Sequence, residues 1–168
     1  MSINALILIV CSVSISLLGS LVLMRNPRSA ENQRFAFSAF SLLCWTISNF
    51  LSDNVDSNLL FFNRLTIFWG VASILSLISF VAIFPNYKII KNNMYLSWHK
   101  ILSVILMFFS FSPWLIVSVS KEGGGEIETS FLYYLFIIYV GFSLLLFFDI
   151  IRLQNKSAIS LAQRQQIK

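Results

Sequence analysis

The sequence predicts an all-α, polytopic transmembrane helix bundle with five membrane spans. Of its 168 residues, 57% are apolar and only 11% are charged, whereas a soluble domain is about a quarter charged. The apolar residues also form five runs of about 20 residues, the length that crosses about 30 Å of hydrocarbon as a helix. This composition excludes a soluble enzyme, a nucleic-acid-binding domain and a secreted disulfide scaffold.

Each expected span ends at a polar or helix-breaking segment. The first is followed by Arg-Asn-Pro-Arg, the second by Ser-Asp-Asn, the third by Pro-Asn and the fourth by a loop with three consecutive glycines. Proline and glycine interrupt helices because one lacks a backbone donor and the other adds backbone freedom. The expected spans cover residues 3–24, 35–51, 65–84, 101–120 and 131–151.

The first run is expected to be a retained membrane helix. The alternative, a cleaved signal peptide, begins with a basic segment and has a shorter apolar core. Residues 1–3 carry no positive charge, and the apolar run continues to Met24. We therefore count this run as the first span.

The distribution of Lys and Arg predicts the orientation of the bundle. The loops after the first and third spans and the tail after the fifth hold 10 of the 12 basic residues, and cytosolic loops are the basic ones in membrane proteins. We therefore expect the N-terminus outside and residues 152–168 as a basic cytosolic loop or linker. The net charge of +5 then reflects contact of these loops with the lipid bilayer and its anionic headgroups, so no nucleic-acid partner is inferred.

Small residues at helical spacing predict packing faces on the first and third spans. Membrane helices associate through close contact of small residues, and residues three or four apart share one face of a helix. A packing seam is the expected role, a polar pore lining is the alternative, and the same faces would suit a homodimer. The residues concerned are Ser12, Ser16, Ser20, Gly70, Ser73 and Ser76.

The outer ends of the second and third spans carry the candidate binding residues. Asn49 lies well inside an expected span, and we expect its amide to pair within the bundle because an unpaired amide in hydrocarbon is costly. Asp53 and Asp56 follow it, and Arg64 and Trp69 lie across a short outer loop. This group either joins two helices, which is the expected role, or binds a small ligand at the outer surface.

Two residues near the fourth span have alternative interpretations. Pro113 lies inside the expected span, where proline kinks a helix, and the kink is either static or a hinge. His99 lies at the expected inner interface. There an amphipathic surface role is favoured over pH sensing.

The sequence carries no pattern that predicts catalysis or metal binding. Metal-ligand spacings, a glycine-rich phosphate loop after a strand and a nucleophile–base pair are all missing from it. No acidic residue falls at mid-membrane, where ion-coupled transporters place several. We therefore expect no enzyme activity on this chain, no catalytic residue, no metal and no cofactor.

One further pattern extends over nearly the whole chain. An inner loop of the form Asn-x-x-x-x-x-Asn-x-x-Phe leads into a second helix that bears a Trp, and a Gln-rich tail at 163–167 follows the fifth span. The positions are Asn26, Asn32, Phe35, Trp45, Asn49, Arg64, Trp69, Phe84 and Pro85. This pattern resembles the first five helices of the N-terminal seven-helix sensor region of membrane histidine kinases.

The resemblance implies a sensor module of a two-component system in the plasma membrane of a prokaryotic cell. The family's last two helices, its phosphoacceptor helix and its ATP-binding domain are missing from these 168 residues. We therefore expect the gene to continue with two apolar stretches and a cytosolic signalling domain. The family motif defines no ligand site, so it assigns no binding residue. A small permease or channel subunit and a structural membrane protein without a ligand are the alternative functions.

Overall fold

A computed structural model describes residues 3–55, 57–84, 94–119 and 127–166. Several positions on which the sequence-based predictions rest lie outside these ranges. They are Asp56, Pro85, Asn86, Lys88, Lys91, the glycines at 123–125, Ile167 and Lys168.

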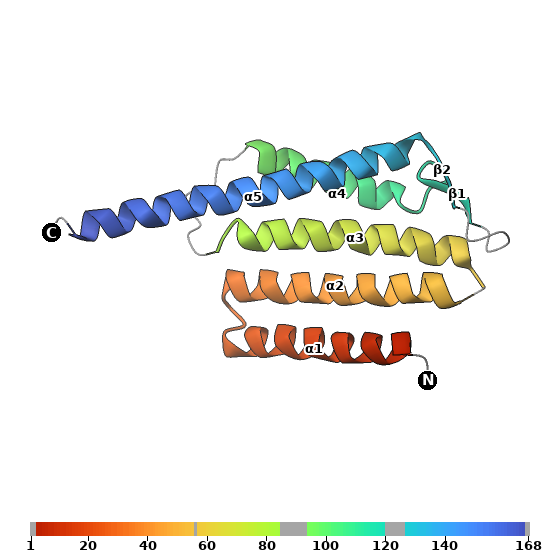
Figure 1. Cartoon of the computed structure of the whole chain (residues 1–168), viewed down its shortest axis with the longest axis horizontal. Coiled ribbons are helices and arrows are strands. Elements are labelled where there is room, and N and C mark those ends of the chain that lie inside the picture. Colours follow the sequence, from red (N-terminus) through yellow and green to blue (C-terminus); the bar gives the residue numbers. More distant parts are fainter. Residues whose placement is uncertain (1–2, 56, 85–93, 120–126, 167–168) are drawn as a thin grey trace.

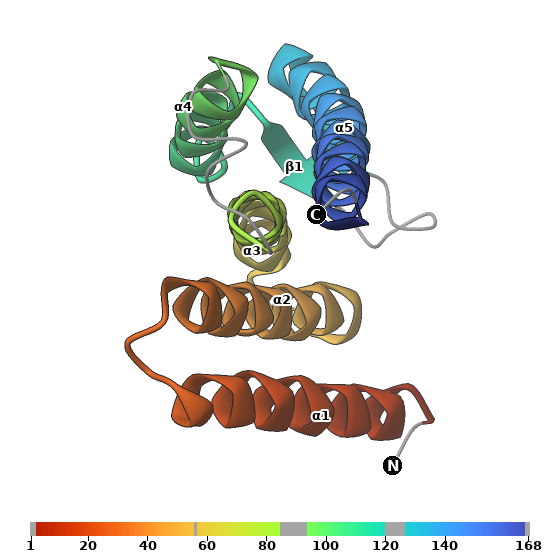
Figure 2. The ribbon, with the colours of Figure 1, turned by 90° about the vertical axis from the view of Figure 1, so that its left-hand side faces the viewer.

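The described residues form a helical bundle with one short hairpin (Figure 1). The first three helices lie in a row, and the last two lie side by side beyond the third (Figure 2). The third helix is therefore central, because it contacts helices on both of its sides. The elements are α1 (Ile3–Arg25), α2 (Ala30–Asn54), α3 (Leu59–Val81), α4 (Met94–Phe109), β1 (Ile116–Val119), β2 (Ile127–Thr129) and α5 (Phe131–Gln166).

Four of these helices are long and apolar enough to cross a membrane. Large apolar side chains cover their outer faces, among them Leu21 at 64%, Phe131 at 72% and Leu145 at 72% exposed. A soluble protein rarely exposes so much apolar surface, whereas hydrocarbon chains solvate it. By the length and composition of these helices, the prediction of a multi-pass helical membrane protein is confirmed, with four candidate spans among the described residues. The four segments are Ala5–Arg25, Ala30–Asn54, Leu59–Val81 and Phe131–Asn155.

The predicted fourth span, 101–120, has the wrong bounds. The helix at this place is α4, which has 16 residues and is about 24 Å long at 1.5 Å per residue. It ends at Phe109, four residues before Pro113, which has no N–H to donate to the Phe109 carbonyl. The Ser110 and Ser112 hydroxyls donate to the carbonyls of Met107 and Phe109 at this end, each at 2.7 Å. Pro113 follows in a turn, so it neither kinks a helix nor acts as a hinge within one.

The second half of that predicted span forms a hairpin with a later segment. Three of the four residues of β1 are β-branched, a type that favours strands. They pair antiparallel with β2, where Ser118 lies opposite Glu128 and donates a hydrogen bond of 2.7 Å to its carboxylate. An apolar strand and an apolar helix give the same hydropathy profile, so the local hydropathy does not distinguish β1 from a continuation of α4.

Other helix ends also differ from the predicted ones. The second helix begins at Ala30, because Ser29 caps it by accepting a hydrogen bond from the Asn32 backbone N–H at 3.4 Å. The third helix, predicted over 65–84, begins at Leu59 and ends at Val81. The fifth helix continues through the predicted loop or linker to Gln166. Gln154 fixes the start of this extension, since its amide donates to the carbonyl of Val81, the last residue of α3, and to that of Phe84.

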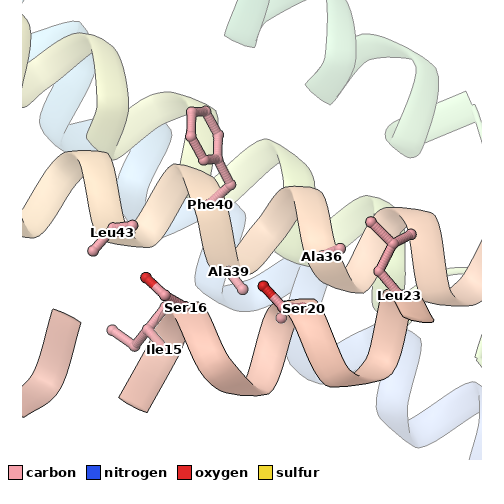
Figure 3. Close-up of a pocket in the computed structure, with 9 residues that line it drawn as sticks. Ile15, Ser16, Ser20, Leu23, Ala36, Ala39, Phe40 and Leu43 are labelled. Atoms are coloured by element: carbon pink, nitrogen blue, oxygen red, sulfur yellow. The ribbon is translucent and has the colours of Figure 1, made fainter. Parts of the chain in front are cut away.

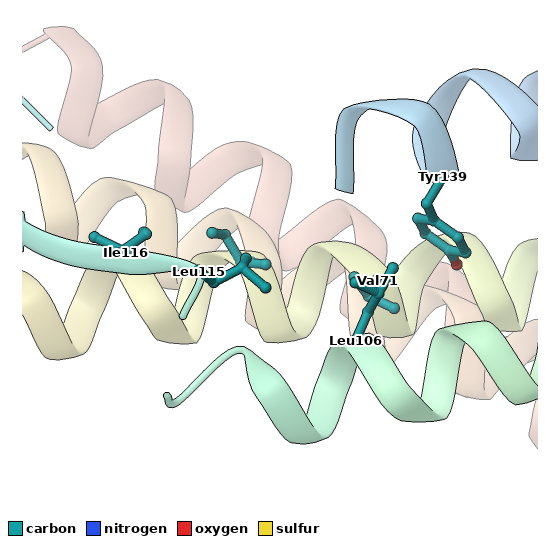
Figure 4. Packing of buried hydrophobic residues seen from close by; sticks show 6 residues of the cluster. Val71, Leu106, Leu115, Ile116 and Tyr139 are labelled. Carbon is teal, nitrogen blue, oxygen red and sulfur yellow. The ribbon is translucent and has the colours of Figure 1, made fainter. Parts of the chain in front are cut away.

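Buried apolar residues gather along both ends of the central helix. The larger cluster joins α3 to α4, α5 and β1, and the Tyr139 ring packs at its edge (Figure 4). The smaller cluster joins Ile78 and Ala82 of α3 to Leu146 and Ile150 of α5. The larger cluster consists of Ile67, Val71, Leu106, Leu115, Ile116 and Tyr139.

The small-residue face of α1 packs against α2 of the same chain. Gly19 is buried, and a Cβ atom added to it would lie 3.0 Å from the Cβ of Ala39. Ser16 and Ser20 are exposed overall, but their hydroxyls point toward α2 (Figure 3) and line a cavity of about 250 Å³ there. The absence of a side chain at Gly19 therefore lets α1 and α2 pack closely at this position.

Replacing Gly19 by Val should weaken the contact between α1 and α2. The new side chain overlaps Ala39, so the helices must separate, and overpacking of this kind costs about 1–3 kcal/mol. Titration of SDS into the detergent-solubilised protein, followed by circular dichroism, measures the free energy of unfolding. Gly141→Val is the matched control, because nothing lies within 4 Å of a Cβ added at Gly141. Equal losses in the two variants would contradict the prediction.

Candidate functional site

Four buried polar residues join α4 to α5. His99 and Ser103 of α4 are both 0% exposed, and Tyr139 and Ser143 of α5 are 1% and 2% exposed. Within each helix the two residues are four apart, which places them on one face. We call these four residues the α4–α5 clasp.

The hydrogen bonds of the clasp form a closed ring. The Ser103 hydroxyl donates to the His99 carbonyl, and the Ser143 hydroxyl donates to the Tyr139 carbonyl, each at 2.7 Å. A hydroxyl has a single hydrogen, so each serine must accept in its second bond. Tyr139 therefore donates its hydroxyl hydrogen to Ser103, and His99 donates Nε2–H to Ser143, both at 2.9 Å.

The His99 ring has one nitrogen that the clasp does not use. Its Nδ1 is buried and has no hydrogen-bond partner among the described residues. Because Nε2 carries the hydrogen, Nδ1 of the neutral ring is an acceptor. The ring also stacks on Tyr139, with centroids 5.2 Å apart and planes inclined by 23°. A proton or a donor that reached Nδ1 would therefore act directly on the α4–α5 contact.

This arrangement makes the clasp the candidate functional site. Buried polar groups in proteins are almost always paired, so an unpaired one requires an explanation. Ionisable residues within a membrane bundle are costly and usually serve a function. The sequence predicts an interfacial surface role for His99, which is wrong because the residue is 0% exposed, and it does not single out Tyr139 or Ser143. The signal in the sequence is a pair of polar residues at i and i+4 on each of two neighbouring helices.

The two serines on the predicted packing face of α3 bond to their own helix. Ser73 donates to the Trp69 carbonyl at 2.8 Å, and Ser76 donates to the Ser73 carbonyl at 2.9 Å. These hydroxyls are satisfied locally and present a small surface to the next helix. A Cβ added at Gly70 would lie 3.3 Å from Trp45 Nε1, which makes this a close contact between α3 and α2. Ser12 of α1 has a buried hydroxyl oxygen with no partner in the described part of the chain.

Asn49 does not face the interior of the bundle as expected. Its side chain is exposed, whereas Ser48 beside it is buried and donates to the Cys44 carbonyl at 2.8 Å. Successive residues of a helix are turned by about 100°, so one position separates the buried side of α2 from the exposed side. The polar face runs through Ser41, Ser48 and Ser52 instead.

Arg64 joins α3 to the segment between α4 and β1. Its Nη1 donates to the Phe111 carbonyl at 3.1 Å, and its Nη2 donates to the Ile116 carbonyl at 2.8 Å. Its Nε is buried without a partner in the described residues. The guanidinium thus holds the turn that follows α4 against α3.

The other binding candidates have different surroundings from Arg64. Trp69 makes edge-to-face contacts with Phe40 and Phe68, at centroid distances of 5.8 and 5.2 Å. Asp53 is exposed near the end of α2. Arg64 and Trp69 thus make separate sets of contacts in the described part of the chain.

The asparagines of the inner-loop motif build the turn between α1 and α2. The Asn32 amide donates to the Val22 carbonyl at 2.8 Å and to the Asn26 carbonyl at 3.2 Å. The Asn26 side chain accepts from the Arg28 backbone N–H at 3.3 Å. Phe35, the last residue of the motif, contacts Phe80 of α3 with centroids 5.3 Å apart. The motif residues thus have structural roles in this chain.

Comparison of the chain with protein-family models, with curated proteins and with solved structures finds no match. The described residues contain no group of three or more His, Cys, Asp or Glu side chains placed to hold a metal ion. The clasp remains the candidate functional site of the described residues.

Proposed function

We propose that this chain is the membrane-embedded input module of a signal-transducing protein, namely the sensor part of a prokaryotic histidine kinase in the plasma membrane. The observation that supports it most is the path of α5. This helix carries Tyr139 and Ser143 of the clasp and continues without a break to Gln166, past the end of α3 (Figure 1). A change of packing at the clasp therefore acts on the helix that leaves the bundle.

In this proposal the chain performs no chemistry itself. The closed ring of hydrogen bonds is one state of the α4–α5 contact, and a stimulus favours a second state in which α5 has moved relative to α3. A stimulus shifts such an equilibrium only if it interacts differently with the two states. The free acceptor Nδ1 of His99 supplies a group for such an interaction.

The charge distribution supports an orientation in which α5 leaves the bundle on the cytosolic side. Successive helices run in opposite directions, so the ends of α1 and α5 share one end of the bundle with the starts of α2 and α4 (Figure 1). Cytosolic ends of membrane helices are enriched in Lys and Arg. This end carries several of the basic residues, among them Arg25, Arg28, Arg34, Lys100 and Arg152.

A fusion with a histidine-kinase catalytic region after Lys168 tests the proposal. Kinase activity in cells requires cytosolic ATP, so an active fusion also places the C-terminus inside. Insertion of one to four alanines after Gln166 should change autophosphorylation with a period of about 3.6 residues. Tyr139→Phe should shift the basal activity several-fold, while Tyr134→Phe should not, because Tyr134 is 61% exposed on the same helix.

Two results would contradict the sensor role. The first is kinase activity that is independent of both the insertions and the Tyr139 variant. The second is saturable solute flux by the purified chain in liposomes, which would favour the permease or channel function.

A further inference from the structure

A groove between α2, α3 and α4 combines two cations with apolar walls. It has a volume of about 370 Å³ and lies at the end of the bundle where the basic residues gather. Arg34 of α2 and Lys100 of α4 line it, together with Ser76 and Ser79 of α3. Two helices far apart in sequence thus bring positive charges to one cavity.

The Arg34 guanidinium is held in place at this groove. Its Nη1 donates to the Ser79 carbonyl at 2.9 Å, which uses one of the five guanidinium donors. Lys100 is exposed, and within the described residues neither cation forms an ion pair with a carboxylate. Glu31, one turn before Arg34, accepts a hydrogen bond from the Ser29 hydroxyl and also interacts electrostatically with Arg34. Because Lys100 adds a second cation, the groove keeps a net positive charge beside this carboxylate.

The apolar wall of the groove faces the surface that hydrocarbon would cover. Phe37 and Val104 line the groove and are 55% and 60% exposed. Arg34 lies in the second turn of α2, and Ser79 lies in the last turn of α3, so the Arg34 guanidinium lies near the ends of two membrane-length helices. Phospholipid headgroups occupy this depth, and basic pockets between helices bind anionic ones.

We propose that this groove binds one anionic phospholipid. Its phosphodiester lies between Arg34 and Lys100, and an acyl chain lies along Phe37 and Val104. Charge complementarity selects an anionic headgroup, and the exposed apolar wall selects a lipid over a soluble phosphate. The inference depends on the groove alone and does not require the signalling role.

Native mass spectrometry of the purified chain in uncharged detergent tests this site. Phosphatidylglycerol should bind at least ten-fold more tightly than phosphatidylcholine with the same acyl chains. Lys100→Gln should weaken phosphatidylglycerol binding about five-fold, because one basic side chain contributes about 1 kcal/mol to binding of anionic lipid. Arg152→Gln is the matched control, since Arg152 is exposed at the same end and does not line the groove.

Three outcomes would overturn the proposal. Equal binding of the two phospholipids would exclude charge selection. Equal losses for Lys100→Gln and Arg152→Gln would place the lipid elsewhere. Competition by glycerol 1-phosphate at the same concentration as phosphatidylglycerol would identify a soluble phosphate as the ligand.

Discussion

Replacement of His99 by Ala is expected to lower the free energy of unfolding by about 2–4 kcal/mol. The change removes the bond from Nε2 to Ser143, the stacking on Tyr139 and the volume of a fully buried ring. A hydrogen bond between membrane helices contributes about 0.6–1.7 kcal/mol, and the cavity accounts for the rest. Unfolding of the purified chain by SDS titration, followed by circular dichroism, measures this loss.

The neighbouring residue provides the control for this prediction. Trp98 is 61% exposed, so Trp98→Ala removes a larger side chain without opening a buried cavity. A double-mutant cycle between His99→Ala and Ser143→Ala should also show a coupling energy of about 0.5 kcal/mol or more. Equal losses for His99→Ala and Trp98→Ala would show that the clasp does not stabilise the bundle.

Arg64→Ala should lower the free energy of unfolding by about 2–3 kcal/mol. Two carbonyls lose a charged donor, and hydrogen bonds to charged groups are worth about 1.5–3 kcal/mol. The Ile116 carbonyl belongs to a residue that is only 2% exposed, so water does not readily replace the lost donor. Arg64→Lys should cost about half as much, because an ammonium on a flexible stem lacks the planar fork that reaches both carbonyls.

Hydrogen exchange gives this prediction a local measurement. Loss of Arg64 should increase amide exchange in residues 110–119, which the guanidinium holds against α3. Arg28→Ala is the control, since Arg28 is exposed at the other end of the bundle. If stability and exchange do not change while the response of a kinase fusion is lost, the helix-joining role is wrong and the ligand-binding role of Arg64 is favoured.

The long apolar helices could be predicted from the sequence because their length and composition are local properties. The fourth span could not. Hydropathy over 101–120 is the same whether the chain continues as a helix or turns after Phe109 into a strand. The outcome depends on the pairing of Ile116–Val119 with Ile127–Thr129, and an average of hydropathy over a sequence window does not register pairing between two segments.

The candidate site was harder to predict than the fold, for a related reason. The sequence shows which residues carry hydroxyl, amide and imidazole groups, but not whether each bonds to its own helix or to a neighbour. Ser73 bonds within α3, whereas Ser103 and Ser143 also accept hydrogen bonds from the opposite helix. Asn49 illustrates the same difficulty, because a rotation by one residue separates its exposed side chain from the buried Ser48.

Because α5 is much longer than a membrane span, a small tilt of this helix displaces its far end. At 1.5 Å per residue, the 36 residues of this helix extend about 54 Å, well beyond the roughly 30 Å of a hydrocarbon core. The part from Gln154, where α5 is bonded to the end of α3, to Gln166 accounts for about 18 Å of that length. A tilt of about 5° with its pivot at Gln154 would therefore displace the tip at Gln166 by about 1.6 Å. A change of packing between helices of the bundle would in this way be carried beyond the bundle by the rigid helix itself.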